Sequence, residues 1–538
     1  MSSAGTTPRR QRLFLFDTTL RDGAQTQGVD FSVEDKRTIA EALDAIGVDY
    51  VEGGWPGANP TDTALFSEDL KLRHARFTAF GMTKKSGRSA GNDPGLAALL
   101  DSKAAAICLV GKSWDFQVKV ALEIPLSENI TNISESIAAV RAKKREALFD
   151  AEHFFDGYRA NPTYALDCLK AASDAGADWL VLCDTNGGTM PEDAYRIVSE
   201  VSTELPGALL GIHAHNDTDQ AVAVSLAAVR GGARQIQGTL NGLGERCGNA
   251  NLCSVIANLA LKEPYASTFE TGIGDRLAKL THVSRLLDEI LNRAPQKHAA
   301  YVGPSAFAHK GGLHVSAVAK DPRTYEHVKP EAVGNRRHVL VSDQAGRSNI
   351  LARMAELGIE VDANDKRISR LLEDVKQREF LGYAYDGAEA SFELLARRAL
   401  GQVPEYFRVD SFRVIVERRH NALGALVTVS EASVKVNVAG EDFHNVGTGN
   451  GPVNALDHAL RKDLGRYSKF LQGLRLVDYK VRILTGGTEA VTRVMIESTD
   501  DQARRWSTVG VSANIVDASF EALSDSICYM LYRDGAPY

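Results

Sequence analysis

The chain has 538 residues, of which 44% are hydrophobic and 24% charged, and its formal net charge at pH 7 is -7. This length exceeds what one compact core supports, so two or three domains are expected. A mildly acidic chain with no basic block, and with no apolar run near the ~20 residues of a membrane span, is expected to bind neither nucleic acid nor a membrane. The six cysteines are scattered without C-x-x-C spacing, as is typical of free thiols in a cytoplasmic enzyme.

The N-terminal half alternates between β-type runs and amphipathic stretches of helical period. Residues 1–12 are polar, lack the apolar segment of a signal peptide and are predicted to be a disordered lead. From 13 to 270, eight strand–helix units in about 260 residues predict an α/β fold of the (β/α)8 TIM-barrel type. A doubly wound open sheet is the competing fold, but it predicts fewer strands and a Gly-rich loop after the first, which residues 17–25 lack. The predicted strands are Leu13–Phe16, Tyr50–Val51, Phe77–Phe80, Ala106–Val110, Ala147–Phe149, Trp179–Leu182, Leu209–Ile212 and Gln235–Leu240, and predicted helices include Val33–Ile46, Asn132–Ala142, Pro162–Ala175, Glu192–Val201 and Ala221–Val229.

The second half changes pattern twice. Residues 271–405 are predicted to be a helical linker region, with helices at Ile273–Asn292, Ile350–Leu357, Asn364–Arg378 and Ala390–Ala399. Residues 406–538 are predicted to be a β-rich domain, with strands at Phe412–Glu417, Ala425–Val429, Ser433–Val438, Tyr479–Ile483 and Thr492–Ser498. Two helices are expected there, one after residues 447–451 and one after 507–510.

A weak internal repeat marks this last region. Gly447, Asn454 and Ala459-Leu460 recur as Gly510, Asp517 and Ala522-Leu523 at a constant offset. Two similar β-rich halves, each ending in a helix, indicate a small pseudo-symmetric domain that binds a ligand between its halves. The repeat does not identify that ligand.

Asp22 follows the first predicted strand, and His213 and His215 lie at the end of the seventh. Because the period of a strand is two, both imidazoles point the same way. A barrel brings the ends of its strands to one mouth, so the carboxylate and the imidazoles are predicted to share a divalent cation. Asn249 offers a further oxygen ligand, or caps the eighth helix instead. Magnesium, manganese, cobalt and zinc all fit such a site.

Other polar residues fall at the same predicted strand ends. Arg21 is either a catalytic cation or half of a structural salt bridge with Asp22. Thr185 either caps a helix or donates a hydrogen bond to a substrate carboxylate. Glu152 ends the fifth strand beside His153, where either is a candidate base or the two form a structural pair. His314 lies outside the barrel, where a lone histidine is more often structural than catalytic.

The residues Leu20-Arg21-Asp22-Gly23 with Gln25 and Lys36 resemble the first signature of the α-isopropylmalate and homocitrate synthases. Residues 210–217, which contain both histidines, resemble the second signature. The resemblance covers nearly the whole chain, because the later regions are similar to the family's linker and its leucine-type regulatory domain. Within the family, residues 55–62, 152–158, 241–251 and 321–326 are most similar to the longer type of citramalate synthase.

This resemblance implies an acyltransferase that condenses acetyl-CoA with pyruvate and hydrolyses the thioester, giving (R)-citramalate and CoA for isoleucine biosynthesis. It implies a metal site of Asp22, His213, His215 and Asn249. Arg21, Gln25 and Thr185 are implied to bind the 2-oxo acid, with Arg21 also supporting the oxyanion. Glu152 is implied to take part in proton transfer. His314 and Tyr325 are implied to reach the site from the linker, in related enzymes from the partner subunit, so a homodimer is expected. The regulatory domain is expected to bind isoleucine or leucine.

Three positions depart from the family's pattern: Met82, Gln117 and Asp219. Met82 and Gln117 lie at neighbouring strand ends, where the side chain of the acceptor is expected. One methylene in such a pocket changes the discrimination between two 2-oxo acids by only ~1–3 kcal/mol. A larger 2-oxo acid as the substrate, as in 2-isopropylmalate synthase, therefore stays the main alternative. A carbon–carbon lyase of the same superfamily and a non-catalytic amino-acid sensor are two further alternatives.

Overall fold

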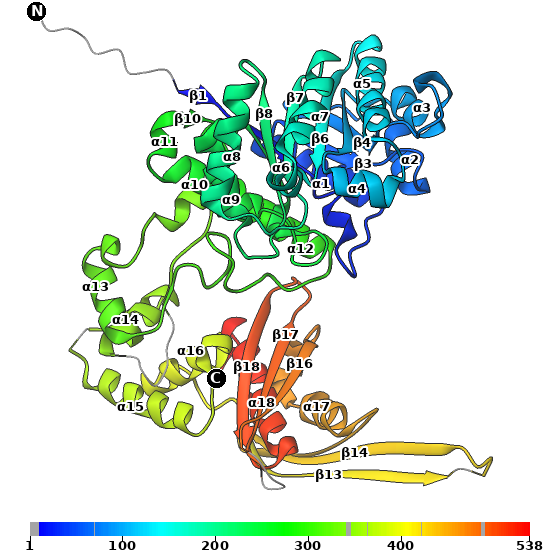
Figure 1. Ribbon diagram of the computed structural model, residues 1–538. Helices are drawn as coiled ribbons and strands as arrows, with labels where there is room; N and C mark the ends of the chain where they lie inside the picture. Colours follow the sequence, from blue (N-terminus) through cyan, green and yellow to red (C-terminus); the bar gives the residue numbers. More distant parts are fainter. Residues whose placement is uncertain (1–9, 69, 340–345, 363, 421, 486–489) are drawn as a thin grey trace, which may run out of the picture. The chain divides into compact units, whose positions relative to one another are not determined.

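The protein is described by a computed structural model covering residues 10–68, 70–339, 346–362, 364–420, 422–485 and 490–538 (Figure 1). It divides into two compact units, one of residues 1–307 and 328–336 and one of residues 308–327 and 337–538. Residues 1–9 of the predicted lead lie outside the described residues. Its last two residues form strand β1 (Gln11–Arg12), which pairs in parallel with β10 (Phe269–Glu270). No helix in the described part of the chain has the length and apolar character needed to span a bilayer.

The first unit is a closed barrel of eight parallel strands in sequential order, which confirms the predicted fold. All eight predicted strands are present, but the last ends at Gly238, two residues before its predicted end, because residues 240–242 form a 3-10 turn. The strands are β2 (Phe14–Asp17), β3 (Tyr50–Gly54), β4 (Arg76–Met82), β5 (Ala106–Lys112), β6 (Glu146–Glu152), β7 (Trp179–Asp184), β8 (Leu210–Ala214) and β9 (Gln235–Gly238).

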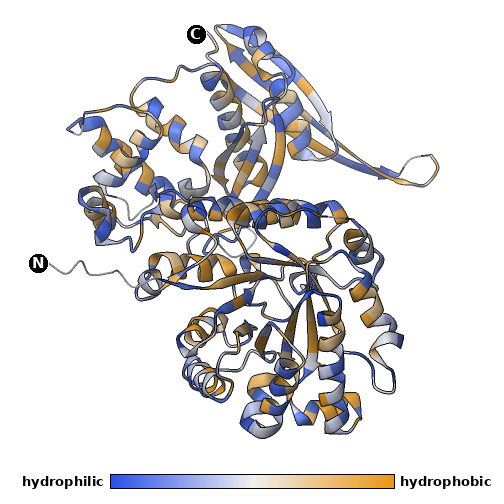
Figure 2. Cartoon of the chain, turned by 90° about the horizontal axis from the view of Figure 1, so that it is seen from above, coloured by the Kyte–Doolittle hydropathy of each residue, from blue (hydrophilic) through white to orange (hydrophobic). Residues whose placement is uncertain are grey.

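Helices surround the barrel, and α5 begins six residues before the predicted start because Pro125 serves as its N-cap. The barrel strands are coloured mainly hydrophobic, whereas the helices are striped in both colours, as expected for elements with one buried face (Figure 2). The helices of this unit are α1 (Val33–Ile46), α2 (Pro60–Ser67), α3 (Pro94–Asp101), α4 (Asp115–Gln117), α5 (Leu126–Ala142), α6 (Phe154–Ala160), α7 (Pro162–Asp174), α8 (Pro191–Glu204), α9 (Ala221–Gly231), α10 (Leu252–Leu261), α11 (Tyr265–Thr268) and α12 (Leu280–Ile290).

The barrel has two apolar layers. One lies between the strands and the helices, and the other fills the inside of the barrel with the rings of Phe16, Tyr50, Phe80 and Trp179 and smaller side chains. Toward the carboxyl ends of the strands the interior becomes polar, with buried Glu52 and Gln237 above that apolar floor. The apolar plug therefore leaves one end of the barrel for polar chemistry.

The second unit begins with helical segments and a short parallel pair, β11 (Ala308–His309) with β12 (His338–Val339). Its helices are α13 (Gly312–Lys320), α14 (Arg347–Glu356), α15 (Lys366–Phe380) and α16 (Glu389–Ala399). The predicted helices at 350–357, 364–378 and 390–399 are present within one to three residues at the ends that the structure describes.

The rest of this unit contains two three-stranded antiparallel sheets, each followed by one long helix. The two strands predicted at 425–438 are one continuous strand, because Ser430, Glu431 and Ala432 pair without interruption on both sides. Strands β15 and β18 were not among the predicted strands, because their glycine- and serine-containing sequences resemble turns. The elements are β13 (Arg408–His420), β14 (Leu426–Val438), β15 (Glu441–Gly449), α17 (Pro452–Lys462), β16 (Arg475–Ile483), β17 (Thr492–Thr499), β18 (Arg505–Ser512) and α18 (Ile515–Arg533).

The internal repeat has a structural cause. A Cβ atom on Gly447 would lie 2.8 Å from the carbonyl oxygen of Ala455, and one on Gly510 would lie 2.1 Å from that of Ala518. Both pairs have the same spacing, and each joins the last strand of a half to the helix that follows. Each half therefore keeps a glycine where helix and sheet approach most closely.

A buried ion pair anchors the loop after β3. The ammonium of Lys36 pairs with the carboxylate of Asp62 and donates to the carbonyl of Gly53 at 2.9 Å. Asp62 also accepts from the backbone N–H of Trp55 at 2.8 Å and from the amide of Asn59 at 2.9 Å. Because both charges are buried, each depends on the other.

We expect Lys36→Met to lower the free energy of unfolding of the barrel by about 3–5 kcal/mol, because it leaves the Asp62 carboxylate buried without its cation. Thermal unfolding followed by circular dichroism measures the change. Arg37→Met is the matched control, since Arg37 lies next along α1 and pairs with exposed carboxylates. An equal effect of both substitutions would contradict the anchoring role.

Candidate active site

A cavity of about 300 Å³ opens at the carboxyl ends of the barrel strands. Its walls come from the ends of most of the barrel strands, which is where barrel enzymes place their chemistry. Seven of the ten predicted site residues line it: Arg21, Asp22, Gln25, Glu152, Thr185, His213 and His215.

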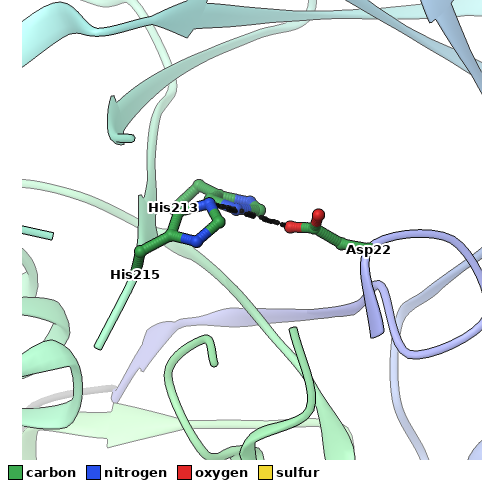
Figure 3. A group of neighbouring side chains, drawn as sticks. All are labelled: Asp22, His213 and His215. Carbon is green, nitrogen blue, oxygen red and sulfur yellow. Dashed lines mark hydrogen bonds and ion pairs between the residues drawn. The ribbon is translucent and has the colours of Figure 1, made fainter. Parts of the chain in front are cut away.

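Asp22, His213 and His215 form a compact group of three possible metal ligands. One ligand atom of each lies within 4.8 Å of the others, and all three side chains are buried. Asp22 Oδ2 is 3.1 Å from His213 Nε2 and 3.9 Å from His215 Nε2, and the two Nε2 atoms are 3.3 Å apart. Figure 3 shows the two imidazoles on one side facing the carboxylate on the other. Two imidazoles and one carboxylate leave further coordination positions open for substrate.

A hydrogen bond on the side of the ring away from the cavity fixes the orientation of His213. Its Nδ1 donates to the side-chain oxygen of Gln237 at 2.8 Å, and its Nε2 faces the cavity. The Gln237 amide donates in turn to Asp150 Oδ1 at 3.2 Å. Such a supporting chain is typical of metal-binding histidines.

The charges of the group also fit a cation. Burial alone would raise the pKa of Asp22, but the Arg21 guanidinium and His213 hold it well below its ordinary value. Burial, followed by the neighbouring His213, lowers the pKa of His215 to about 3. Burial lowers the pKa of His213, but the hydrogen bond and the charge of Asp22 outweigh burial and raise it. At neutral pH Asp22 is therefore ionised and His215 neutral, the forms that bind metal, whereas a cation at this point competes with a proton on His213.

Asn249 completes the group from the loop after β9. Its side-chain nitrogen donates to Asp22 Oδ2 at 2.7 Å and lies 3.2 Å from His213 Nε2. Its side-chain oxygen is buried without a hydrogen-bond partner in the described part of the chain. Turning the amide by 180° exchanges the two atoms and directs the oxygen at the same point as the other three ligands. The arrangement supports Asn249 as a ligand.

Arg21 is held between two carboxylates. Its Nε donates to Glu52 Oε2 at 2.7 Å, its terminal nitrogen lies 3.1 Å from Asp22 Oδ1, and its guanidinium lies 3.8 Å from the centre of the Phe80 ring. Burial disfavours the charged guanidinium, but Asp22 and Glu52 outweigh that effect and raise its pKa. Arg21 is therefore a fixed cation beside the metal group.

Thr185 faces the cavity from the end of β7. Its hydroxyl oxygen accepts from the backbone N–H of His153 at 2.8 Å, which leaves the hydroxyl hydrogen to donate elsewhere. Arg246 binds the Thr185 carbonyl at 2.8 Å and both oxygens of Asp217 at 2.7 and 2.9 Å. This arginine therefore joins the loops after β7, β8 and β9.

The structure adds residues that the sequence analysis did not place in the site. Lys112 and Asp150 line the cavity, and Gln237 supports it from below. Glu52, which follows the second predicted strand and was expected on this face, binds Arg21. Asp150 is two residues before Glu152 on β6, so the period of two could have indicated that it faces the same way. Burial raises the pKa of both Asp150 and Glu52 above their ordinary values.

His314 and Tyr325 belong to the second compact unit. Their ring centres are 4.2 Å apart, and both residues are exposed. They therefore form one small aromatic surface within that unit. Their role in catalysis stays a prediction.

Comparison with known proteins agrees with this geometry. The family model described as HMGL-like matches residues 12–286, the homocitrate synthase post-HMGL domain-like model matches 301–379, and the LeuA allosteric (dimerisation) domain matches 386–531. A protein of Geobacter sulfurreducens named (R)-citramalate synthase is 51% identical over 523 residues, which is 96% of this chain and 97% of that protein. The chain belongs to the citramalate synthase family.

Two further relatives set the range of the similarity. An Aquifex aeolicus protein named (R)-citramalate synthase is 48% identical over 97% of this chain and 98% of that protein. A Methanopyrus kandleri protein named probable 2-isopropylmalate synthase is 32% identical over 95% of this chain and 97% of that protein. The chain is thus more similar to these citramalate synthases than to that isopropylmalate synthase.

We expect Gln237→Met to weaken metal affinity by about 10–100-fold, because His213 loses the acceptor that fixes its ring. Titration of the metal-free protein with Mn²⁺ or Zn²⁺, followed by calorimetry, measures the change. Gln235→Met is the control for the contacts behind Gln237: Gln235 is buried two residues earlier on the same strand, and its side-chain oxygen accepts from the Gln237 amide at 3.4 Å, whereas His213 Nδ1 donates to Gln237. Unchanged affinity in Gln237→Met would mean that the ring is held by other contacts.

Proposed function

We propose that the protein is a metal-dependent acyltransferase that condenses acetyl-CoA with pyruvate and then hydrolyses the thioester, giving (R)-citramalate and CoA. The observation that carries this proposal is the group of Asp22, His213 and His215 beside the fixed cation Arg21, inside a cavity of only about 300 Å³. That volume is at the lower limit of small-molecule sites and fits a small 2-oxo acid.

Each site residue has a part in this reaction. Asp22, His213, His215 and Asn249 hold a divalent cation, which acts as a Lewis acid on the ketone when bound. Arg21 faces the oxygen on which negative charge develops. Thr185 donates its free hydroxyl hydrogen to the carboxylate of the 2-oxo acid, with Gln25 at the rim. Glu152 takes a proton from the methyl group of acetyl-CoA. Magnesium, manganese, cobalt and zinc all suit this mixture of oxygen and imidazole ligands.

A second, larger cavity supports acetyl-CoA as co-substrate. It has a volume of about 710 Å³ and adjoins the metal cavity. Its wall includes the apolar Leu122 and Ile124, and the cations Lys85 and Arg88 lie exposed at its edge. An apolar wall with cations at the edge suits a ligand that has an acyl chain and phosphate groups.

The part of the metal cavity that is expected to hold the side chain of the 2-oxo acid is apolar. Trp55, Phe80, Met82 and Val110 line it, and Met82 is 41% exposed there. A long side chain at the mouth of so small a cavity favours the methyl group of pyruvate over a larger substituent. A larger 2-oxo acid is the second candidate.

We expect the purified, metal-supplemented protein to release free CoA from acetyl-CoA fastest with pyruvate, and at least 10-fold more slowly with 2-oxoisovalerate or phenylpyruvate, since each extra methylene that does not fit costs ~1–3 kcal/mol. A thiol reagent measures the CoA. Preference for a larger acid would keep the mechanism and change the substrate. No release with any acid, despite bound metal, would contradict the proposal and favour a lyase or a sensor.

We also propose that the C-terminal region, residues 406–538, is a regulatory and dimerisation domain, that residues 271–405 link it to the barrel at 13–270, and that the protein is a homodimer. Each C-terminal sheet is packed against a helix on one side, whereas apolar strand residues such as Ile415, Val481 and Ile483 are exposed. Exposed apolar sheet residues of this kind are typical of a surface that binds another subunit.

If His314 and Tyr325 serve the partner's barrel, mixed subunits of His314→Ala and Asp22→Ala regain activity. Random pairing of equal amounts gives one intact site in half of the dimers, so about a quarter of the parent's activity is expected. CoA release after mixing, dissociation and reassociation measures it. No recovery, with dimers verified by size, would mean that each subunit uses its own His314.

Isoleucine or leucine is the proposed effector of the regulatory domain. The two halves related by the repeat offer two similar surfaces for such a ligand. Isoleucine or leucine added to the CoA-release assay is expected to lower the rate. The same rate at millimolar concentrations of both amino acids would contradict this effector assignment.

A further inference from the structure

The metal cavity and the larger cavity share a wall. Four residues line both: Trp55, Met82, Lys112 and Glu152. The first two are apolar, and the other two form an ion pair in which Lys112 Nζ lies 2.5 Å from Glu152 Oε2. The polar part of the boundary between the cavities is therefore one ammonium and one carboxylate.

The barrel fixes this pair through its backbone. Lys112 and Glu152 are the last residues of β5 and β6 and stand opposite each other in the parallel register. The backbone N–H and the hydroxyl of Ser113 both donate to the carbonyl of Glu152, at 3.1 and 2.8 Å. The amide of Asn129 donates to the carbonyl of Lys112 at 2.8 Å. The side chains stay partly exposed, at 16% and 24%, so ligands in either cavity reach them.

Lys112 differs from the other two cations that line the metal cavity. Arg21 is held by Asp22 and Glu52, and Arg246 by Asp217 and the carbonyl of Thr185. Lys112 is paired with Glu152, which is the residue proposed to take the proton. Glu152 becomes neutral when it takes the proton. Among these three cations, Lys112 is therefore the one whose carboxylate partner loses its charge during the reaction.

We propose that Lys112 is a further catalytic residue, which stabilises the enolate oxygen of the thioester while Glu152 takes the proton. This inference rests on the proposed function. In the step, a C–H bond of the acetyl methyl group breaks and the proton goes to a Glu152 oxygen. The C–H electron pair becomes the carbon–carbon double bond, and the π pair of the thioester carbonyl moves to its oxygen.

The charges balance within the pair. Before the step the ammonium faces a carboxylate and a neutral thioester. After it, the ammonium faces a neutral carboxylic acid and an enolate oxygen. The ammonium exchanges one anionic partner for another, so no charge is left unpaired at the boundary between the cavities.

The test uses the full-length, metal-loaded enzyme with Lys112→Met, Lys112→Arg and the control Lys119→Met. Lys119 is an exposed lysine that pairs with Asp115 in the segment that follows β5. Circular dichroism verifies the fold of each variant. Turnover, calorimetric acetyl-CoA affinity and the isotope effect on kcat with [methyl-²H₃]acetyl-CoA are measured for all.

Lys112→Met is expected to lower kcat by about 10²–10³-fold, the effect of removing one oxyanion-stabilising donor. Its isotope effect is expected to increase, because breaking the C–H bond becomes the slowest step. Acetyl-CoA affinity is expected to stay near that of the parent. Lys112→Arg is expected to recover part of kcat, because it keeps the charge with a different geometry. Lys119→Met is expected to match the parent.

Two results would overturn the inference alone while the parent enzyme is active. One is a Lys112→Met turnover within about threefold of the parent. The other is a lower turnover with weakened acetyl-CoA affinity and an unchanged isotope effect, which would make Lys112 a binding residue. A parent enzyme that releases no CoA with any 2-oxo acid would overturn the proposed function and this inference together.

Discussion

Closure of the barrel is the constraint on which the site depends. Asp22 and His213 are 191 positions apart in sequence, and they meet because β2 and β8 both pair with β9. Four residue pairs between β2 and β9 and three between β8 and β9 bring the end of β2 near the end of β8. His213 lies on β8 itself, whereas Asp22 and Asn249 lie on the loops that follow β2 and β9, so the closed barrel fixes the points from which these loops start.

Buried carboxylates control the charge around this point. Arg21 is neutralised by Asp22 and Glu52, and His213 is oriented through Gln237 by Asp150. Buried charges without partners would destabilise the barrel, so each is paired or hydrogen-bonded. The same contacts that stabilise the interior therefore set the protonation states and orientations of the ligands.

Much of the fold and part of the site could be predicted from the sequence. The alternation of apolar runs gave all eight barrel strands, and the period of two along a strand placed His213 and His215 on one side. The pairing of Lys112 with Glu152 could not be predicted, because it depends on the register between neighbouring strands, which no local pattern contains. Strands β15 and β18 were missed for a related reason: Gly447 and Gly510 lower strand propensity, and their purpose is the close approach of a helix.

The charge balance also indicates why the metal and the 2-oxo acid belong together. Arg21 and Arg246 are already matched by carboxylates, and Lys112 by Glu152, so the cations that line the cavity are paired before substrate enters. The carboxylate of a 2-oxo acid adds another negative charge to a site that already contains Asp22. A divalent cation supplies the missing positive charge at the point where the ligands converge. The 2-oxo acid is therefore expected to bind only weakly until the metal is bound, and each then strengthens the binding of the other.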